Sequence, residues 1–342
     1  MSKTLNFGII GAGTIASSHA KAIAGNPRAE LYAVCDIIEE NARNFAEEFE
    51  VQHVFTSLDA MLQVKELDVV NVCLPSGAHE WAVTAAARAG KHILCEKPID
   101  IHLDKIDNMI AAVRENQVKL GCVYQRRTMP EAIAARDAVQ SGKLGRMVLG
   151  DAYLKYYRSA EYYRSAGWRG TWEHDGGGAL MNQGVHGIDL IQWMMGDIES
   201  VFAHTAALVR DIEVEDTAVV AVKFKSGALG VIQGATSVYP GQETRFELHG
   251  ENGSFIFGDK GIQLWEAREG ELKQPVVGDA GTPGADPRSI ALEGHQALVE
   301  DLIEAITVDR EPLINGEEAR KAVAVIMAIY ESSLTGKEVF LS

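Results

Sequence analysis

Several features of membrane and nucleic-acid-binding proteins are missing from this 342-residue sequence. It contains no apolar run of about 18 residues or more, so no membrane-spanning helix is expected. The first residues, Met1 to Thr4, lead into a strand pattern instead of a signal-peptide core. Basic residues are in deficit, and the formal net charge of -16 argues against binding to nucleic acid or to an anionic membrane. A cytoplasmic protein is therefore the default expectation.

Cysteine is also scarce, with only four residues in the chain. Cys35, Cys73, Cys95 and Cys122 lie 22 to 38 positions apart, which is too wide for paired metal-ligand motifs. Each of them ends a predicted strand. We therefore expect reduced thiols that serve as small core residues.

The remaining composition is that of an ordinary globular protein, with 46% apolar and 23% charged residues. The length exceeds that of one typical domain and suggests two. We place the first domain at residues 1–123 and the second at residues 124–342, with closing helices that can pack back on the first domain.

A glycine-rich turn follows the first predicted strand. The apolar run from Leu5 to Ile10 leads into Gly11-Ala12-Gly13-Thr14-Ile15-Ala16, and a helical pattern follows. Glycines allow a tight turn and a close backbone approach, and a helix N-terminus presents free N–H groups to a pyrophosphate. This order of strand, turn and helix is the context that a dinucleotide-binding fingerprint requires.

A carboxylate ends the second predicted strand. Asp36 follows the run 30–35, close to the distance expected for the acidic residue that binds an adenosine ribose. An aspartate there accepts hydrogen bonds from both ribose hydroxyls and repels a 2′-phosphate, while Ile37 and Ile38 offer no phosphate-binding group. The two motifs together predict NAD, with NADP disfavoured. The alternative is a doubly wound domain whose turn is unused.

Strand and helix patterns alternate through the first domain. Strands are predicted at residues 5–10, 30–35, 53–55, 69–74, 92–95 and 118–123, with helices between them. This alternation predicts an α/β domain in which helices cover both faces of a parallel sheet.

Longer strands follow one another in the second domain. They are predicted at residues 147–157, 198–209, 217–225, 229–237, 244–250 and 253–257. Successive strands without intervening helices predict an α+β domain with a mostly antiparallel sheet. A loop is expected over residues 266–290, followed by helices at 293–306 and 317–334 and a strand near Val339.

Charged residues end the strand predicted at residues 92–95, where Glu96, Lys97 and Pro98 follow in succession. Ligands of an open α/β sheet lie outside the carboxyl ends of the strands, so Glu96 and Lys97 are expected to project into the crevice. The proline restricts the backbone of Lys97 and gives its ammonium a preset direction. The alternative is a solvated loop with an ordinary surface lysine.

The neighbouring strand ends in Pro75-Ser76-Gly77, beside the same crevice. His79 follows at the start of a helix. A histidine in this position either contributes to the cofactor site or serves as a structural capping group.

A second polar cluster follows the glycines at 176–178. At about 100° per residue, Asn182, His186, Asp189 and Trp193 fall on one side of a helix and apolar residues on another. The lysines and glutamates of a solvated face are missing, but the chemistry alone is equally compatible with a structural role. A metal site of His174, His186 and Asp189 matches no standard ligand spacing, and no metal is expected.

These residues resemble the glucose-fructose oxidoreductase, inositol dehydrogenase and MocA family, often written Gfo/Idh/MocA. The resemblance covers essentially the whole chain, and its specific part is Glu96-Lys97-Pro98 together with His186 after a glycine-rich helix start. It implies an N-terminal Rossmann NAD-binding domain followed by an α+β domain with a large, mostly antiparallel open sheet. It also implies a homodimer or homotetramer formed through that sheet and a cis peptide bond before Pro98.

The resemblance further implies the roles of individual residues. Lys97 would touch the nicotinamide end of the cofactor and the reacting hydroxyl, His186 would be the general base or acid, and Asn182 would orient the hydroxyl. The expected cofactor-binding residues are Gly11, Gly13, Thr14, Ile15, Asp36, Pro75, Ser76, His79, Glu96, Lys97 and Gln125. The expected substrate-binding residues are Lys97, Arg127, Tyr157, Arg164, Trp168, Arg169, Trp172, Asn182 and His186.

Asn182 departs from the pattern of inositol-dehydrogenase-like members, which usually carry an aspartate there. An aspartate would strengthen the histidine as a base, whereas asparagine cannot share a proton. Asn182-Gln183 looks more like the branch that oxidises nucleotide-linked amino sugars and related pyranosides at C3, although it is not confined to that branch.

The function expected from these features is hydride transfer between NAD and a secondary alcohol of a sugar, sugar derivative or cyclitol, in either direction. One alternative is an enzyme that holds NAD tightly and recycles it between successive sugars. Another is a non-catalytic NAD-binding sensor.

Overall fold

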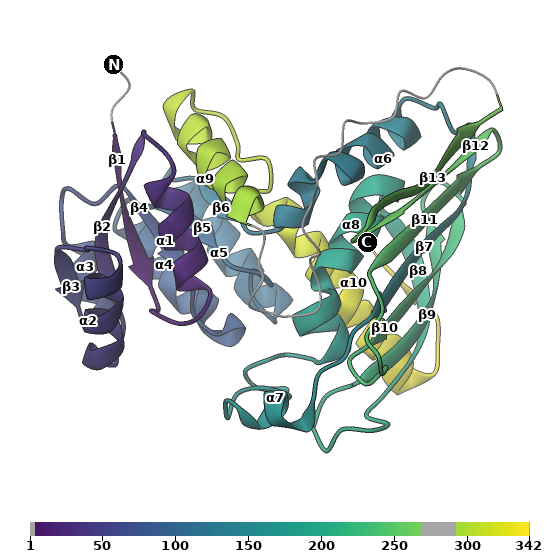
Figure 1. Cartoon of the computed structure of the whole chain (residues 1–342), viewed down its shortest axis with the longest axis horizontal. Helices are drawn as coiled ribbons and strands as arrows, with labels where there is room; N and C mark the ends of the chain where they lie inside the picture. Colours follow the sequence, from purple (N-terminus) through teal and green to yellow (C-terminus); the bar gives the residue numbers. More distant parts are fainter. Residues whose placement is uncertain (1–3, 269–291, 342) are drawn as a thin grey trace. The chain divides into compact units, whose positions relative to one another are not determined.

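The computed structural model describes residues 4–268 and 292–341 of the chain (Figure 1). The chain divides into two compact units. The first comprises Met1–Gln125 and Ile290–Arg320, and the second comprises Arg126–Ser289 and Lys321–Ser342. The domain boundary placed after residue 123 stays a prediction. No helix within the described ranges is long and apolar enough to span a membrane.

The first unit is built on a parallel sheet of six strands in the order β3-β2-β1-β4-β5-β6. The strands are β1 (Leu5–Ile10), β2 (Ala29–Cys35), β3 (His53–Phe55), β4 (Val69–Val72), β5 (His92–Cys95) and β6 (Leu120–Cys122). The chain order reverses between β1 and β4, and such a switch point opens a crevice at the carboxyl ends of the strands. The predicted Rossmann architecture is confirmed.

Helices cover this sheet. They are α1 (Ala16–Ala24), α2 (Glu39–Glu48), α3 (Leu58–Leu62), α4 (His79–Arg88), α5 (Leu103–Glu115) and α9 (Leu292–Thr307), with a short 3-10 turn at Ser76–Ala78. Figure 1 shows α9, from the far end of the chain, beside α1, while α4 packs against α5. Helix α9 also contacts β5, so a distant segment completes the core next to the strand that precedes Glu96.

The second unit is built on an eight-stranded sheet in the order β13-β12-β11-β7-β10-β9-β8-β14. The strands are β7 (Met147–Lys155), β8 (Ile198–Ala206), β9 (Thr217–Phe224), β10 (Leu229–Ala235), β11 (Arg245–Gly250), β12 (Gly253–Gly258), β13 (Gly261–Ala267) and β14 (Val339–Phe340). Every pair is antiparallel except β7 with β10. The predicted mostly antiparallel sheet is therefore confirmed.

The helices of this unit include α6 (Pro130–Gln140), α7 (Ala160–Arg164) and α8 (Val185–Met195), which a π-helix at Ala179–Gly184 precedes. Gln125–Thr128 forms a 3-10 turn, and the long α10 (Gly316–Thr335) belongs partly to each unit. Helix α8 packs on β7, and the π-helix packs on β9 and β10. Figure 1 shows α6 and α8 on the same face of the sheet.

Two expectations about the region after β12 differ from the structure. Strand β13 was not predicted, and Glu266 and Ala267 belong to it instead of to a loop. Its residues hydrogen-bond to β12 as the outermost strand, a pairing that no local signal announces. The rest of the loop predicted to residue 290 lies largely outside the described residues. All four cysteines are buried thiols, as expected.

Candidate active site

The glycine-rich turn has the geometry that a dinucleotide requires. Gly11 has a φ of +91°, and a Cβ there would lie 2.8 Å from the carbonyl oxygen of Cys73. At Gly13 an added Cβ would meet nothing within 4 Å, so the turn faces open space. Among the described residues, no protein acceptor takes the N–H groups of Gly13, Thr14 or Ile15. Free donors at the start of α1 fit the pyrophosphate of NAD.

Asp36 is tied to this turn by its carboxylate. Oδ2 accepts a hydrogen bond from Ala12 N at 2.8 Å, and Oδ1 accepts one from Ile38 N at 2.9 Å. These two bonds fix the carboxylate at the end of β2, and each oxygen keeps a lone pair for another donor. The arrangement fits a ribose whose two hydroxyls donate to the same carboxylate. The neighbouring Ile37 is 85% exposed and offers no charge to a 2′-phosphate.

Lys97 and Glu96 differ in their surroundings. Lys97 is half-buried at the carboxyl end of β5, and its peptide bond to Pro98 is cis, as the resemblance implies. Glu96 is only 5% exposed, and its side chain is bonded to buried histidines. The expectation that Glu96 projects into the crevice is therefore wrong. Its partners come from α1 and α9, which no local pattern connects to β5.

His79 is also occupied inside the protein. It is 1% exposed, with Nδ1 2.9 Å from Pro98 O and Nε2 2.9 Å from Leu74 O. Its ring therefore joins the segments that follow β4 and β5, which corresponds to the structural alternative. Pro75 is exposed and Ser76 half-buried in the same turn, and their predicted contacts with the cofactor stay predictions. Gln125, directly after β6, is half-buried, and its role also stays a prediction.

The glycines before α8 are packed too tightly for any side chain. A Cβ on Gly177 would lie 2.0 Å from Tyr330 Oη, and one on Gly178 would lie 1.9 Å from Glu215 O. Glu215 accepts hydrogen bonds from Gly178 N, Leu180 N and Tyr330 Oη at 2.8 to 3.0 Å. These contacts hold the π-helix, whose last turn leads directly into the residue pair Val185 and His186.

Burial is the dominant influence on Glu215. It raises the pKa of this carboxyl to about 7, although the backbone N–H groups and the tyrosine hydroxyl favour the charged form. A carboxyl with a pKa near neutral pH is therefore hydrogen-bonded to the segment that leads into the predicted catalytic residues.

Asn182 belongs to a polar network that also includes its neighbour. Its Nδ2 donates to Asp175 Oδ1, and its Oδ1 accepts from Gln183 Nε2 at 2.7 Å. Gln183 also bonds Tyr162 Oη at 2.9 Å and accepts from Arg158 at 2.7 Å. His186 is half-buried at the start of α8. Asn182 and His186 thus lie on consecutive helical segments, in the order that the sequence predicts.

The polar stripe predicted for this helix is divided in the structure. Asp189 is 2% exposed and forms a buried bidentate ion pair with Arg127, at 2.6 and 2.8 Å. The guanidinium of Arg127 also lies 5.5 Å from the ring of Trp193. Asp189 therefore does not share an exposed face with His186. Arg127, which was expected to bind substrate, is 3% exposed in a core ion pair.

The other predicted substrate residues fall into two groups. Tyr157, Trp168, Arg169 and Trp172 have partly exposed rings or guanidinium groups. Arg169 stacks on Trp168 and Tyr162 and donates to the Tyr162 hydroxyl. Arg164 instead pairs with Glu161 on the surface, where its side chain is 72% exposed. The contacts of all these residues with substrate stay predictions.

Sequence reasoning missed Arg158, Tyr162 and Asp175 in this network. Arg158 is 9% exposed, and its guanidinium lies 5.6 Å from the ring of Tyr162. Among the described residues, the Nε atoms of Arg158 and Arg169 are buried without a hydrogen-bond acceptor. The available signal was a dense run of arginine and tyrosine between residues 156 and 169 in an otherwise acidic chain.

Comparisons with known proteins identify the family of the chain. Residues 5–124 match a model of the oxidoreductase family with an NAD-binding Rossmann fold, and residues 132–256 match the GFO/IDH/MocA C-terminal domain. An uncharacterized oxidoreductase of Bacillus subtilis, YrbE, is 30% identical over 99% of this chain and 97% of its own. The chain belongs to the GFO/IDH/MocA oxidoreductase family.

Other relatives of this oxidoreductase have known names. The myo-inositol 2-dehydrogenase of Thermotoga maritima is 29% identical, with 96% of both chains covered. The crystal structure of the WlbA dehydrogenase from Bordetella pertussis, in complex with NADH and UDP-GlcNAcA, is 33% identical. Its TM-score is 0.89, and the match covers 100% of this chain and 99% of that one.

Family membership confirms the predicted fold, cofactor and enzyme class. The oxidoreductase is an NAD-dependent dehydrogenase or reductase of the family that acts on the CH–OH groups of sugars and cyclitols. The turn before α1 and the carboxylate of Asp36 are the part of this chain that fits NAD.

Proposed function

We propose that this oxidoreductase transfers a hydride between NAD and a secondary alcohol of a nucleotide-linked sugar acid. The observation that carries the substrate class is the gathering of two guanidinium groups, those of Arg158 and Arg169, at 5.6 and 4.2 Å from the ring of Tyr162. A carboxylate or phosphate oxygen is the strongest acceptor for such donors. The similarity to a dehydrogenase crystallised with UDP-GlcNAcA favours the same class.

A second observation favours this class over an inositol. Asn182 takes the place where inositol-dehydrogenase-like members usually carry an aspartate, and its amide is bonded to Asp175 and Gln183. An amide orients a hydroxyl without adding charge beside His186. The Asn182-Gln183 pair leads from the predicted catalytic helix to Arg158, through the 2.7 Å bond between Gln183 and that arginine.

The proposed mechanism assigns a separate task to each side chain. Bound NAD supplies the hydride-accepting chemistry. His186 takes the proton of the alcohol, and a positioned general base typically contributes about 10² to 10⁴ in rate. Lys97 stabilises the negative charge that develops on the alcohol oxygen, because a preorganised cation is most effective at that point of the reaction. Asn182 orients the hydroxyl. The reverse reaction uses the same groups.

A substrate screen with purified enzyme tests this proposal. UDP-GlcNAcA, the corresponding neutral UDP-sugar, free sugars and inositols are offered with NAD, and absorbance of the reduced nicotinamide is followed. We expect the acidic nucleotide sugar to have the highest kcat/KM. An inositol or a neutral sugar as the best substrate would contradict the proposed class. Oxidation without release of NADH, with cofactor retained on the enzyme, would reveal cofactor recycling instead.

Arg158→Met provides the matched residue test. A hydrogen bond to a charged group contributes about 1.5 to 3 kcal/mol, so KM for the acidic substrate should rise by about 10-fold or more. The KM for its neutral counterpart should change much less. Arg146→Met, at an exposed position of the same unit and outside the predicted site, is the control. Equal changes of KM for both substrates would show that Arg158 does not contact the acidic group.

A further inference from the structure

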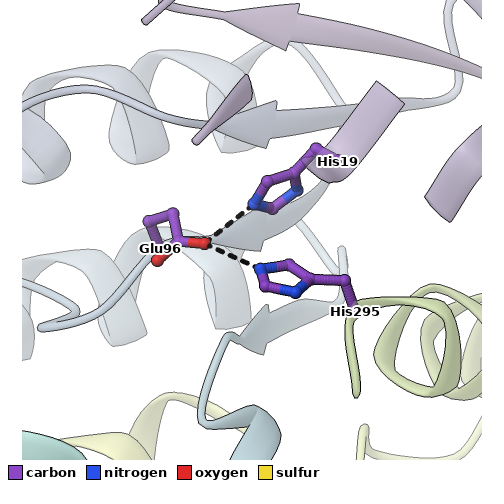
Figure 2. A group of neighbouring side chains, drawn as sticks. All are labelled: His19, Glu96 and His295. Atoms are coloured by element: carbon purple, nitrogen blue, oxygen red, sulfur yellow. Dashed lines mark hydrogen bonds and ion pairs between the residues drawn. The ribbon is translucent and has the colours of Figure 1, made fainter. Parts of the chain in front are cut away.

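Glu96 lies at the centre of a buried cluster of three ionisable side chains (Figure 2). Its Oε1 is 2.9 Å from His19 Nε2 and 3.4 Å from His295 Nε2. The exposed fractions of the two histidines are 0% and 1%. Figure 2 shows both rings directed at the same carboxylate oxygen, His19 from α1 and His295 from α9. The cluster therefore ties the cofactor-binding helix and a C-terminal helix to the end of β5.

The hydrogen bonds define the proton on His19. Asn71, from the middle of β4, places its Nδ2 2.8 Å from His19 Nδ1. With the amide in this orientation, Nδ2 donates to His19 Nδ1, so the proton of the neutral ring is on Nε2, facing Glu96. Burial lowers the pKa of His19, and the neighbouring carboxylate offsets this only in part. His19 is therefore a neutral donor to Glu96.

Glu96 is the charged member of the cluster. Burial would raise its pKa, but hydrogen bonds from His19 and His295 outweigh this effect and hold the pKa well below its usual range. The result is a carboxylate that stays ionised inside the protein, with N–H donors directed at one of its oxygens.

The second oxygen of Glu96 connects this buried charge to the next residue. Oε2 accepts a hydrogen bond from the backbone N of Lys97 at 3.1 Å. The backbone N of Glu96 is itself bonded to Val72 O at 3.0 Å, which extends the parallel ladder with β4. The carboxylate thus restrains the main chain where the lysine side chain begins.

A metal ion is the competing explanation for this cluster. The ligand atoms of His19, Glu96 and His295 lie within 4.8 Å of one another, which a metal could bridge. A histidine that binds metal through Nε2 carries its proton on Nδ1 and donates it to an acceptor. Asn71 presents an amide nitrogen to that atom instead. The arrangement therefore favours a hydrogen bond from His19 Nε2 to Glu96 over a metal ion bound by both side chains.

We infer that Glu96 is a positioning residue for Lys97, with His19 and His295 holding its carboxylate in place. This inference rests on the catalytic role proposed for Lys97. The negative charge and the bond to Lys97 N together fix the main chain from which the ammonium extends. A misplacement of about 1 Å at a catalytic group can cost about 10²-fold in rate, so small shifts here are sufficient to matter.

Glu96→Gln is the direct test, because it keeps the shape and changes the hydrogen bonding. A glutamine has only one acceptor oxygen, which can accept either from Lys97 N or from the histidines. In either orientation its NH₂ group faces the N–H donor on the other side, and that hydrogen bond is lost. We expect kcat to fall by about 10²-fold, as for a misplaced catalytic group, with unchanged affinity for NAD measured by calorimetry. Thermal unfolding of the same sample reports that the variant is folded.

A matched pair at His295 separates positioning from general packing. Glutamine can still donate an N–H to Glu96, whereas leucine fills similar space without a donor. We expect His295→Gln to keep most of kcat and His295→Leu to lose more, with NAD affinity unchanged in both. Equal kcat in the pair would overturn the part assigned to His295.

Other outcomes identify which part of the account fails. Full kcat in folded Glu96→Gln, beside an inactive Lys97→Met, would overturn the positioning role and leave the proposed function intact. Full kcat in Lys97→Met would overturn both. A loss of NAD affinity equal to the loss of kcat would assign Glu96 to the cofactor instead. One equivalent of metal in the purified enzyme, absent from Glu96→Gln, would replace the positioning role with a metal site.

Discussion

The carboxylate of Asp36 has two functions that a single substitution can separate. It accepts hydrogen bonds from Ala12 N and Ile38 N, and we propose that its charge also selects against the 2′-phosphate of NADP. Asparagine preserves the size and one acceptor oxygen but removes the charge. The proposed selection against NADP depends on that charge.

Asp36→Asn is therefore expected to weaken discrimination between the two cofactors. A hydrogen bond to a charged group contributes about 1.5 to 3 kcal/mol, so the preference for NAD in kcat/KM should fall by about 10-fold or more. The measurement is a pair of kinetic series with NAD and NADP. Asp59→Asn, on α3 of the same unit, is the control and should keep the wild-type ratio. An unchanged ratio in Asp36→Asn would show that other groups select the cofactor.

Sequence predicts a residue well when its partners are local and poorly when they are distant. Asp36 was assigned correctly to a strand end because the signal lies in the order of strand, turn and helix. The burial of Glu96 could not be predicted, since His19 is 77 positions away and His295 is 199 positions away. Arg127 was placed at the substrate for the same reason, because its partner Asp189 is 62 positions away.

At the scale of elements, the π-helix before α8 depends on a single buried carboxyl. Glu215 accepts from Gly178 N and Leu180 N, and its own carbonyl accepts from Ala179 N at 2.9 Å. Three consecutive residues of the turn are thus bonded to one residue of another segment. The charge state of Glu215 should therefore influence how firmly the segment that carries Asn182 and His186 is held.

This arrangement predicts a pH-dependent stability. The folded pKa of Glu215 is about 7, above the ordinary value of 4.5, so the folded state retains a proton that the unfolded chain has lost. The contribution of Glu215 to stability is then greatest below the pKa of the unfolded chain and is lost as the pH rises through about 7. The rise in the pKa of Glu215 corresponds to a contribution on the order of 3 kcal/mol to the free energy of unfolding, which is lost at high pH.

Urea unfolding at about pH 5 and about pH 8 measures this effect. The stability difference between the two pH values should be smaller in Glu215→Gln, which has no carboxyl to titrate. Glu213→Gln, at an exposed position two residues earlier, is the control and should behave like wild type. Identical pH dependence in Glu215→Gln and wild type would show that Glu215 keeps the same protonation state when the chain unfolds.

The elements themselves were predicted more completely in the first unit than in the second. Strands β1, β3 and β5 begin and end at the predicted residues. The apolar runs of β1 and β5 are marked clearly because a glycine follows the first and a charged residue follows the second. Strand β13 has a mostly half-buried pattern and follows a glycine, so its pairing with β12 decides its conformation. The π-helix depends on contacts with Glu215 that no periodicity encodes.

At the scale of the whole molecule, one face of the second sheet exposes several large apolar side chains within its unit. Register pairs place Leu229 beside Leu149 and bring Phe202 and Val219 to the same face. These four side chains are 40% to 55% exposed. An exposed apolar patch of this kind marks an interface in many soluble proteins. We propose that this face forms the interface of the homodimer or homotetramer that the family resemblance implies. Substitutions on it test the proposal.

Leu229→Glu is expected to weaken such an assembly, because it places a carboxylate beside the exposed Leu149 on this face. Light scattering after size exclusion measures the mass of each variant. Leu334→Glu, at an exposed leucine of α10, is the control and should keep the wild-type mass. A wild-type enzyme with the mass of one chain would contradict the proposal.

The central claim is that the ammonium of Lys97 promotes alcohol oxidation by the NAD-bound enzyme. Lys97→Met removes the charge and keeps most of the length of the unbranched side chain, so NAD binding should persist. Removal of one group that stabilises a developing oxyanion typically lowers kcat by about 10² to 10³. The decisive measurement is kcat of this variant at saturating NAD and substrate, with NAD affinity determined by calorimetry. The account predicts at least that loss with NAD still bound, and a wild-type kcat would contradict it.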